Sequence, residues 1–207
     1  MPKPNFLGTR EFVTHSLPHV HGRTLDLGAG TAKYKPIILE KASTYTAFDL
    51  FSGPNIDVVG DILHTGFPDG SFETVFCTQV FEHIPQPWLA ALEIKRLLAT
   101  GGVAIVTAPF LQASHADPHD YFRYTMEGMK SLFANEGFEI LDNGMYGKTC
   151  FVLFDFIKLR WFNPYATKQS PGSVRMARYL AKWGFTLDRF VKNDIIYGNS
   201  YVIARKV

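Results

Sequence analysis

The chain has 207 residues, of which 46% are hydrophobic and 19% are charged, a composition typical of a globular domain. Its formal net charge of +2 is too small for a surface that follows a nucleic-acid backbone, so nucleic acid is not expected as the main substrate. The two cysteines give neither a disulfide framework nor metal-ligand spacing, and no apolar run predicts a signal peptide or a membrane span. We therefore expect one cytoplasmic domain over residues 1–207.

Short apolar runs alternate with helical patterns along the chain, which predicts an α/β fold with helices around a parallel sheet. A first helix is expected over residues 6–17 and should end at Pro18, because proline interrupts a helix. The strands predicted after it cover residues 23–26, 45–48, 56–59, 74–77 and 103–107.

A glycine-bearing turn follows the first predicted strand, and an acidic residue stands at the end of the second. This is the layout of a nucleoside-binding α/β site. Gly28 and Gly30 lack a Cβ atom, so the backbone can turn sharply and present N–H groups to a ligand. Asp49 is placed to accept hydrogen bonds from both ribose hydroxyls, and Asp61 or the backbone of Ile62 to contact adenine. The pattern predicts a nucleoside ligand.

The residues around this turn disfavour two other nucleotide sites. A dinucleotide fingerprint has a third glycine where this chain has Lys33. The chain also lacks the glycine-lysine run of a phosphate-binding P-loop. Neither a pyrophosphate nor a nucleoside triphosphate is therefore the expected ligand.

The second half of the chain continues the alternation of helices and strands. Apolar residues recur at three and four over residues 88–98, which predicts an amphipathic helix that ends at Gly101. A further helix is expected over residues 125–135, with Thr125 as its N-cap and Glu127 in its first turn. The remaining predicted elements are a strand over 138–145, a helical insertion over about 150–192 and a last strand over 200–205.

Titratable residues gather in two segments that should lie beyond the carboxyl ends of the strands, where ligands bind in open α/β sheets. Because an imidazole has an ordinary pKa of about 6.5, His83 or His119 can accept a proton from a hydroxyl at neutral pH. Asp120 can orient such a histidine. These residues are the candidates for acid–base chemistry.

The same two segments allow a structural interpretation. In it, Asp120 and Arg123 pair to hold the loop, Tyr121 and Tyr124 pack, and Glu82 with its neighbour caps the helix that follows. A metal site is a third interpretation, formed by His115, Asp117, His119 and Asp120. We expect no metal there, because these residues crowd one proline-containing loop with no partner cluster elsewhere.

The motifs resemble those of the class I methyltransferases that use S-adenosylmethionine, in particular the small-molecule branch called type 11. Residues 26–30, Asp-Leu-Gly-Ala-Gly, resemble the first motif of that family, Asp49 its ribose acid, and Asp61-Ile62 its adenine contact. The likeness continues through residues 67–75, 80–84 and 97–102. It implies a Rossmann-like, seven-stranded, mostly parallel sheet with helices on both faces and an antiparallel last strand inserted between its neighbours.

The resemblance also implies a set of site residues. S-adenosylmethionine is the expected cofactor, with contacts at Asp26, Gly28, Ala29, Gly30, Asp49, Leu50, Asp61, Ile62 and Thr78. The loop over residues 115–125 resembles the acceptor-side loop of many type 11 enzymes, some of them associated with glycan pathways. The expected catalytic residues are His119, His83 and Asp120, and the expected acceptor-binding residues are Tyr121, Arg123 and Tyr124.

Two positions depart from the family pattern without removing an expected ligand contact. Ala32 stands where the first motif often has a further glycine, and Glu73 stands where aspartate is usual. Alanine is small enough to preserve the turn, and Glu73 should face solvent.

The expected function is O-methylation of a hydroxyl or carboxyl group on a small molecule, such as a sugar or a lipid-linked metabolite. The alternatives are N-methylation, a catalytically inactive S-adenosylmethionine-binding partner protein, and a dinucleotide oxidoreductase. The apolar run over residues 151–162 precedes a basic stretch, so it is either a lid and core element or a patch that rests on an anionic membrane surface.

Overall fold

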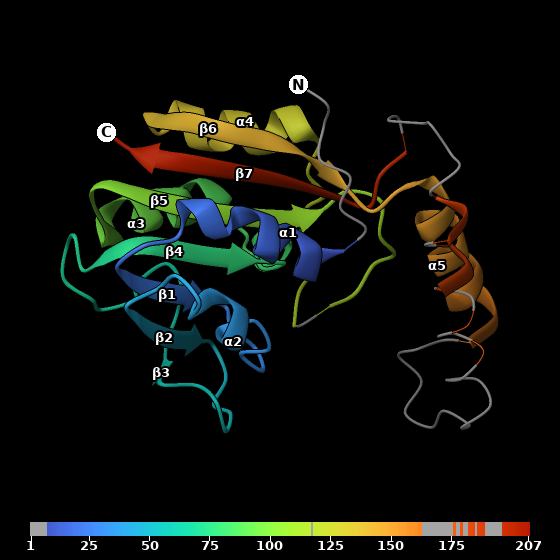
Figure 1. The fold of residues 1–207 in the computed structure, drawn as a ribbon, viewed down its shortest axis with the longest axis horizontal. Coiled ribbons are helices and arrows are strands. Elements are labelled where there is room, and N and C mark those ends of the chain that lie inside the picture. Colours follow the sequence, from blue (N-terminus) through green and yellow to red (C-terminus); the bar gives the residue numbers. More distant parts are fainter. Residues whose placement is uncertain are drawn as a thin grey trace.

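The computed structural model describes residues 8–116, 118–162, 176, 179, 182–184, 186–188 and 196–207. Its described part contains a seven-stranded sheet in the order β3-β2-β1-β4-β5-β7-β6 (Figure 1). The strands are β1 (Arg23–Leu27), β2 (Thr44–Asp49), β3 (Val58–Val59), β4 (Phe72–Thr78), β5 (Leu98–Pro109), β6 (Phe138–Tyr146) and β7 (Asn199–Lys206). This Rossmann-like sheet confirms the predicted fold class.

The direction of the strands places the binding crevice. Strands β1 to β5 pair in parallel, whereas β7 runs antiparallel between β5 and β6, as predicted. The chain leaves β1 toward β2 on one side and later returns to β4 on the other. Ligands of open α/β sheets bind at such a switch point, outside the carboxyl ends of the strands.

Helices cover both faces of the sheet, as the sequence predicts (Figure 1). On one face, α3 (Pro87–Leu97) and α4 (Met126–Asn135) bury apolar side chains such as Ile94 and Phe133. On the other face, α1 (Thr9–Ser16) and the short α2 (Lys35–Ile38) bury residues such as Phe12 and Ile38. The two apolar layers hold the strands in register.

The boundaries of two helices test particular sequence predictions. Thr125 is the N-cap of α4, and its hydroxyl accepts a hydrogen bond from the Gly128 N–H at 3.0 Å, as expected. The prediction that Gly101 ends the preceding helix is wrong. Helix α3 ends at Leu97, and the chain turns directly into β5, because Leu98 is extended and fully buried. Gly101, at φ +80°, instead occupies an irregularity in the pairing of β4 with β5.

The predicted helical insertion begins with α5 (Thr149–Phe162), which lies beyond the carboxyl ends of β4 and β5 (Figure 1). Most of the remaining insertion, and the side chains of Trp161 and Phe162, fall outside the described residues. Among the residues described, no helix has the length and apolar character to cross a membrane.

Candidate functional site

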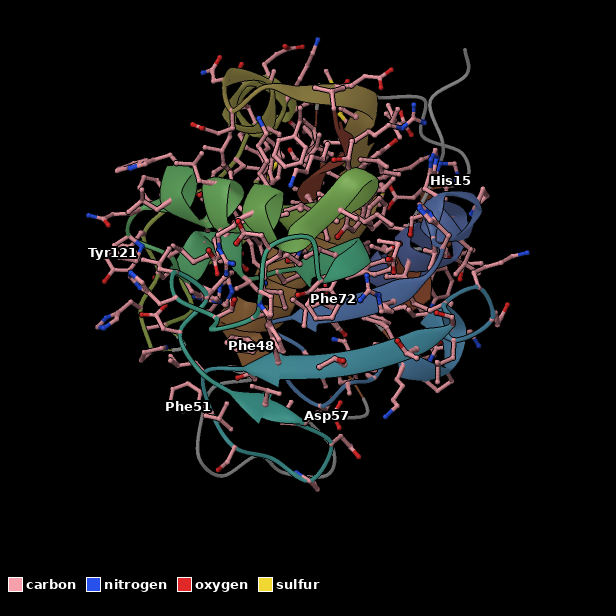
Figure 2. The ribbon with its side chains drawn as sticks, turned by 90° about the vertical axis from the view of Figure 1, so that its left-hand side faces the viewer. His15, Phe48, Phe51, Asp57, Phe72 and Tyr121 are labelled. Carbon is pink, nitrogen blue, oxygen red and sulfur yellow. The ribbon has the colours of Figure 1, made fainter. Side chains whose placement is uncertain are left out.

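A cavity of about 530 Å³ opens where the parallel strands end. Its walls come from the loops after β1, β2, β3 and β4, together with the loop that follows β5. The residues that line it include Gly28, Gly30, Asp49, Leu50, Phe51, Asp61, Ile62, Gln79, Val80, His83, His119 and Tyr121. Phe51 and Tyr121 lie on the same side of the molecule, opposite His15 of α1 (Figure 2).

The glycine turn after β1 forms one wall of the cavity. Gly28 has φ +81°, and its N–H donates to the Phe48 carbonyl of β2 at 2.8 Å. A Cβ atom on Gly28 would stand 2.3 Å from Cγ2 of Val80, so no larger residue fits. Gly30 also has a positive φ, of +58°, but faces open space. The turn thus packs tightly at Gly28 and leaves room for a ligand beside Gly30.

Asp49, at the end of β2, is tied to the glycine turn. Its Oδ2 accepts a hydrogen bond from the Gly30 N–H at 2.8 Å, and its Oδ1 accepts one from the Phe51 N–H at 3.1 Å. Each carboxylate oxygen has a further lone pair and can accept a second donor. The carboxylate is therefore held in place with capacity left for two ligand hydroxyls.

The loop after β3 brings the predicted adenine contacts to the same cavity. Asp61 Oδ1 accepts a hydrogen bond from the Leu63 N–H at 2.9 Å, and Ile62 packs partly against the core. Leu50 lies on the same wall and is 51% exposed. The structure thus brings together six of the nine predicted cofactor residues: Gly28, Gly30, Asp49, Leu50, Asp61 and Ile62.

The other three lie behind the cavity wall. The Ala29 N–H donates to the Phe48 carbonyl at 3.0 Å, and Thr78 pairs with Thr107 in the sheet. Asp26 is buried in β1, where its Oδ2 accepts a hydrogen bond from the Tyr45 hydroxyl at 2.5 Å. Burial raises the pKa of Asp26 to about 6. These residues support the turn, and direct contact with a cofactor stays a prediction for them.

The raised pKa of Asp26 has a consequence for stability. Because the folded chain binds this proton more tightly, the stability it contributes is present below pH 3.8, the ordinary value, and is lost as pH rises toward 6. We expect Asp26→Asn to remove that loss. The difference in unfolding free energy between parent and variant should change by about 2.4 kcal/mol between pH 4 and pH 7. Urea denaturation of both proteins at the two pH values measures it, and an unchanged difference would refute the assigned pKa.

Gln79 is a cavity residue that the sequence did not single out. It follows β4 directly and has φ +57°, a left-handed conformation that is uncommon for a residue with a side chain. Its side-chain amide donates to Thr107 Oγ1 at 3.2 Å and to the Tyr146 hydroxyl at 3.3 Å. The sequence predicts that Gln79 follows a central strand, but it does not predict the left-handed backbone conformation of this residue.

The loop after β5 is held together by Asp120 and Arg123. The Arg123 guanidinium donates to both carboxylate oxygens of Asp120, at 2.7 Å for Nη2 to Oδ2, and to the carbonyls of Gln112 and Ala113. These hydrogen bonds hold the pKa of Asp120 well below its usual range. The contacts match the structural interpretation of this pair, and a catalytic role for Asp120 stays a prediction.

The tyrosines of this loop differ in their surroundings. Tyr124 is buried, and its hydroxyl donates to the Phe81 carbonyl at 3.1 Å, which anchors the loop to the core. Tyr121 is 47% exposed and lines the cavity. Its N–H donates to the Glu82 carbonyl at 2.7 Å. Tyr121 is therefore placed to touch a ligand, whereas Tyr124 is a packing residue.

His83 and His119 both line the cavity. They touch one another through the His83 Nδ1 and the His119 carbonyl, 2.5 Å apart. The suggestion that Glu82 and His83 cap the following helix is wrong. Both belong to a 3-10 turn, η2 (Phe81–His83), and the N-cap of α3 is Gln86.

Sequence reasoning missed the partner of these residues. His115, from the loop after β5, places its Nε2 3.7 Å from Glu82 Oε1, and the His83 Nε2 lies at the same distance. The Glu82 side chain is fully buried, and its carboxylate raises the pKa of His115 above the ordinary value. Of the four residues considered as metal ligands from the sequence, His115 belongs to this cluster, His119 and Asp120 do not, and Asp117 lies outside the described residues.

Comparison with known proteins agrees with this geometry. Residues 25–106 match a family model described as a methyltransferase domain, Methyltransf_11. A protein of Mycobacterium sp. (strain KMS), called an uncharacterized methyltransferase, is 28% identical over 97 residues, which is 42% of this chain and 38% of the relative. The chain therefore spans well under half the length of that relative.

Solved structures share the fold at lower identity. The cyclase SpnF superimposes with a TM-score of 0.65 at 21% identity, over 95% of this chain and 79% of SpnF. A phosphoethanolamine N-methyltransferase of Haemonchus contortus, in complex with S-adenosyl-L-methionine, gives 0.60 at 16% identity, over 98% and 53%. Residues 25–106 are therefore similar to a methyltransferase domain, and the likeness to the solved structures shows a shared fold.

Proposed function

We propose that this chain transfers a methyl group from S-adenosylmethionine to an oxygen of a small-molecule acceptor. One observation carries the proposal. The lining of one cavity combines Gly30, Asp49 and Asp61, which form the proposed cofactor wall, with two imidazoles, His83 and His119, which form the proposed acceptor wall. A cofactor held against the cofactor wall leaves the acceptor wall to an acceptor.

The cofactor wall fits the nucleoside by its chemistry. Asp49 offers two anchored carboxylate oxygens to the ribose hydroxyls, and Asp61 with Ile62 borders the space for adenine. The open space beside Gly30 accommodates the ligand itself. S-adenosylmethionine supplies a methyl group that is activated by its bond to a sulfonium sulfur. The neutral thioether that remains after the transfer is a good leaving group. The main task of the chain is to position the acceptor in line with it.

The acceptor wall supplies a base. When an acceptor oxygen attacks the methyl carbon, the carbon–sulfur bond breaks and its electron pair stays on sulfur. The hydroxyl proton passes to an imidazole. A neutral imidazole accepts a proton near neutral pH, which favours a hydroxyl acceptor at His119 or His83. A carboxyl acceptor needs positioning alone, and Tyr121 can contribute to that.

Removing the ribose contact tests the cofactor wall. We expect Asp49→Ala to weaken S-adenosylmethionine binding by about 1.5–3 kcal/mol, the range for hydrogen bonds to a charged group. Calorimetric titration of the cofactor into both proteins measures the difference. Asp69→Ala is the control, because that carboxylate is 81% exposed and outside the cavity lining. Parent-like affinity in the Asp49 variant would show that the ribose lies elsewhere.

The exposed surface of α5 supports a narrower proposal, in which the acceptor is a lipid-linked molecule. The described part of α5 exposes three large apolar side chains, Leu153, Phe156 and Ile157, at the carboxyl end of the sheet. Exposed apolar side chains near basic residues favour the surface of anionic membranes. We infer that α5 rests on such a surface while the cavity takes a lipid-linked acceptor.

Vesicle sedimentation tests the membrane contact. We expect the chain to sediment with anionic vesicles at low salt, less with neutral ones, and Phe156→Ser to reduce the bound fraction. Leu92→Ser is a matched control, since Leu92 of α3 is 44% exposed, as Phe156 is. No sedimentation, together with full activity on a water-soluble acceptor, would make α5 an ordinary lid.

A further inference from the structure

A cluster of three side chains adjoins the acceptor end of the cavity. Glu82 and His83 lie on η2, and His115 comes from the loop after β5. One ligand atom from each lies within 4.8 Å of the others. His83 also lines the cavity, so the cluster borders the space assigned to the acceptor.

The hydrogen bonds of the two imidazoles fix which nitrogen faces the cluster. The His83 Nδ1 lies 2.5 Å from the His119 carbonyl oxygen, and the His115 Nδ1 lies 3.2 Å from the Ala113 carbonyl oxygen. A carbonyl only accepts hydrogen bonds, so each Nδ1 carries a proton. In the neutral ring, each Nε2 then presents a lone pair toward Glu82.

Glu82 adds a third acceptor to this space. Its side chain is fully buried, and within the described residues neither carboxylate oxygen has a hydrogen-bond donor. A buried carboxylate without donors or a paired charge is strongly unfavourable. With both rings neutral, two imidazole lone pairs and a carboxylate converge without a donor between them. A cation stabilises this arrangement, either as a proton on one imidazole or as a bound metal ion.

We propose that Glu82, His83 and His115 bind a divalent transition-metal ion, with Zn²⁺ as the best match. Two imidazoles and one carboxylate form a common ligand set for zinc, and metal-binding histidines typically donate their other N–H to a carbonyl or carboxylate. Tetrahedral zinc with bonds of about 2.0–2.1 Å separates its ligands by about 3.3 Å. Each imidazole Nε2 lies 3.7 Å from Glu82 Oε1, and the three ligand atoms lie within 4.8 Å of one another, so the side chains must move closer by up to about 1.5 Å to reach that value.

The proposed site changes the assignment of the base, a step that rests on the proposed function. With the ion bound, the His83 Nε2 is occupied, and His119 is the remaining imidazole on the cavity wall. Three protein ligands leave a coordination position open to water or to an acceptor oxygen. The acceptor class that fits is then an oxygen compound able to coordinate a metal, such as a hydroxy acid or a vicinal diol.

Metal titration of the full chain, without cofactor or turnover, is the test. After chelator treatment, we expect one equivalent of Zn²⁺ to bind in competition with a chromogenic indicator. Mg²⁺, which prefers oxygen ligands, should not compete. Glu82→Gln and His115→Ala should each weaken binding by about 100-fold or more, beyond the 10–100-fold typical of losing an outer-sphere partner. His64→Ala, an exposed histidine outside the cluster, is the control.

A readout on the parent avoids dependence on variants that fail to fold. Co²⁺ added to the metal-free chain should give the intense visible bands of a four-coordinate site, and Zn²⁺ should displace them. Absence of stoichiometric binding, or binding that Glu82→Gln leaves unchanged, would overturn the proposal and identify the cluster as a carboxylate paired with a protonated imidazole. Because no methyl transfer is measured, this outcome leaves the proposed function intact.

Discussion

Replacing Gly28 by alanine is expected to destabilise the chain by about 2–5 kcal/mol and to abolish measurable cofactor binding. Two effects add at this position. The backbone at φ +81° is unfavourable for any residue with a Cβ atom, and that atom would stand 2.3 Å from Cγ2 of Val80. Val80 belongs to the cavity wall, so relief of the clash moves the wall. Urea denaturation and calorimetric titration measure the two effects separately.

Two other glycines separate strain, packing and ligand space. Gly66 has φ +77° and open surroundings, so Gly66→Ala should show the backbone cost alone, about 1–2 kcal/mol. Gly30 has φ +58° and open surroundings within the cavity, so Gly30→Ala should show a similar cost and also weaken cofactor binding. Equal stability losses in the Gly28 and Gly66 variants would contradict the packing role of Gly28.

Replacing the base by alanine is expected to lower turnover by about 10²- to 10⁴-fold while cofactor affinity stays close to that of the parent. Two imidazoles line the cavity, and the proposed metal site leaves the role of base to His119. Steady-state kinetics of His119→Ala, with cofactor affinity measured in parallel, provides the comparison. His64→Ala is the control for loss of an exposed histidine.

The kinetic results for these variants distinguish a catalytic role of the histidines from a structural one. A parallel loss of affinity and turnover in His119→Ala would indicate that the imidazole has a structural role. If neither His119→Ala nor His83→Ala slows the reaction, positioning alone must carry it, as expected for an acceptor that is already ionised.

Much of the fold follows from local sequence patterns. The central strands β4 and β5 contain short apolar runs, at residues 75–77 and 103–106, and Thr125 carries the side chain that an N-cap needs, so both were predictable. The end of α3 was not, because Gly101 looks like a helix terminator, whereas the buried side chain of Leu98 draws the chain into β5 three residues earlier. Tertiary packing decided that boundary. The four-residue α2 is too short to leave a periodic signal.

The two parts of the candidate site differ in how well the sequence predicts them. Gly28, Gly30, Asp49 and Asp61 follow successive strands at a known spacing, so the topology alone brings them together. The contact between Glu82 and His115 joins residues far apart in the chain and depends on how one loop folds over η2. No periodicity or spacing encodes such a contact. The left-handed backbone of Gln79 is equally invisible in its residue type.

Titration with S-adenosylhomocysteine tests the central claim most directly, namely that this cavity is a nucleoside site for the methyl donor. We expect one binding site per chain, competition by S-adenosylmethionine, no binding of a nicotinamide dinucleotide, and a marked loss of affinity in Gly30→Ala. Failure of S-adenosylhomocysteine to bind a folded chain, or tighter binding of the dinucleotide, would contradict the assignment.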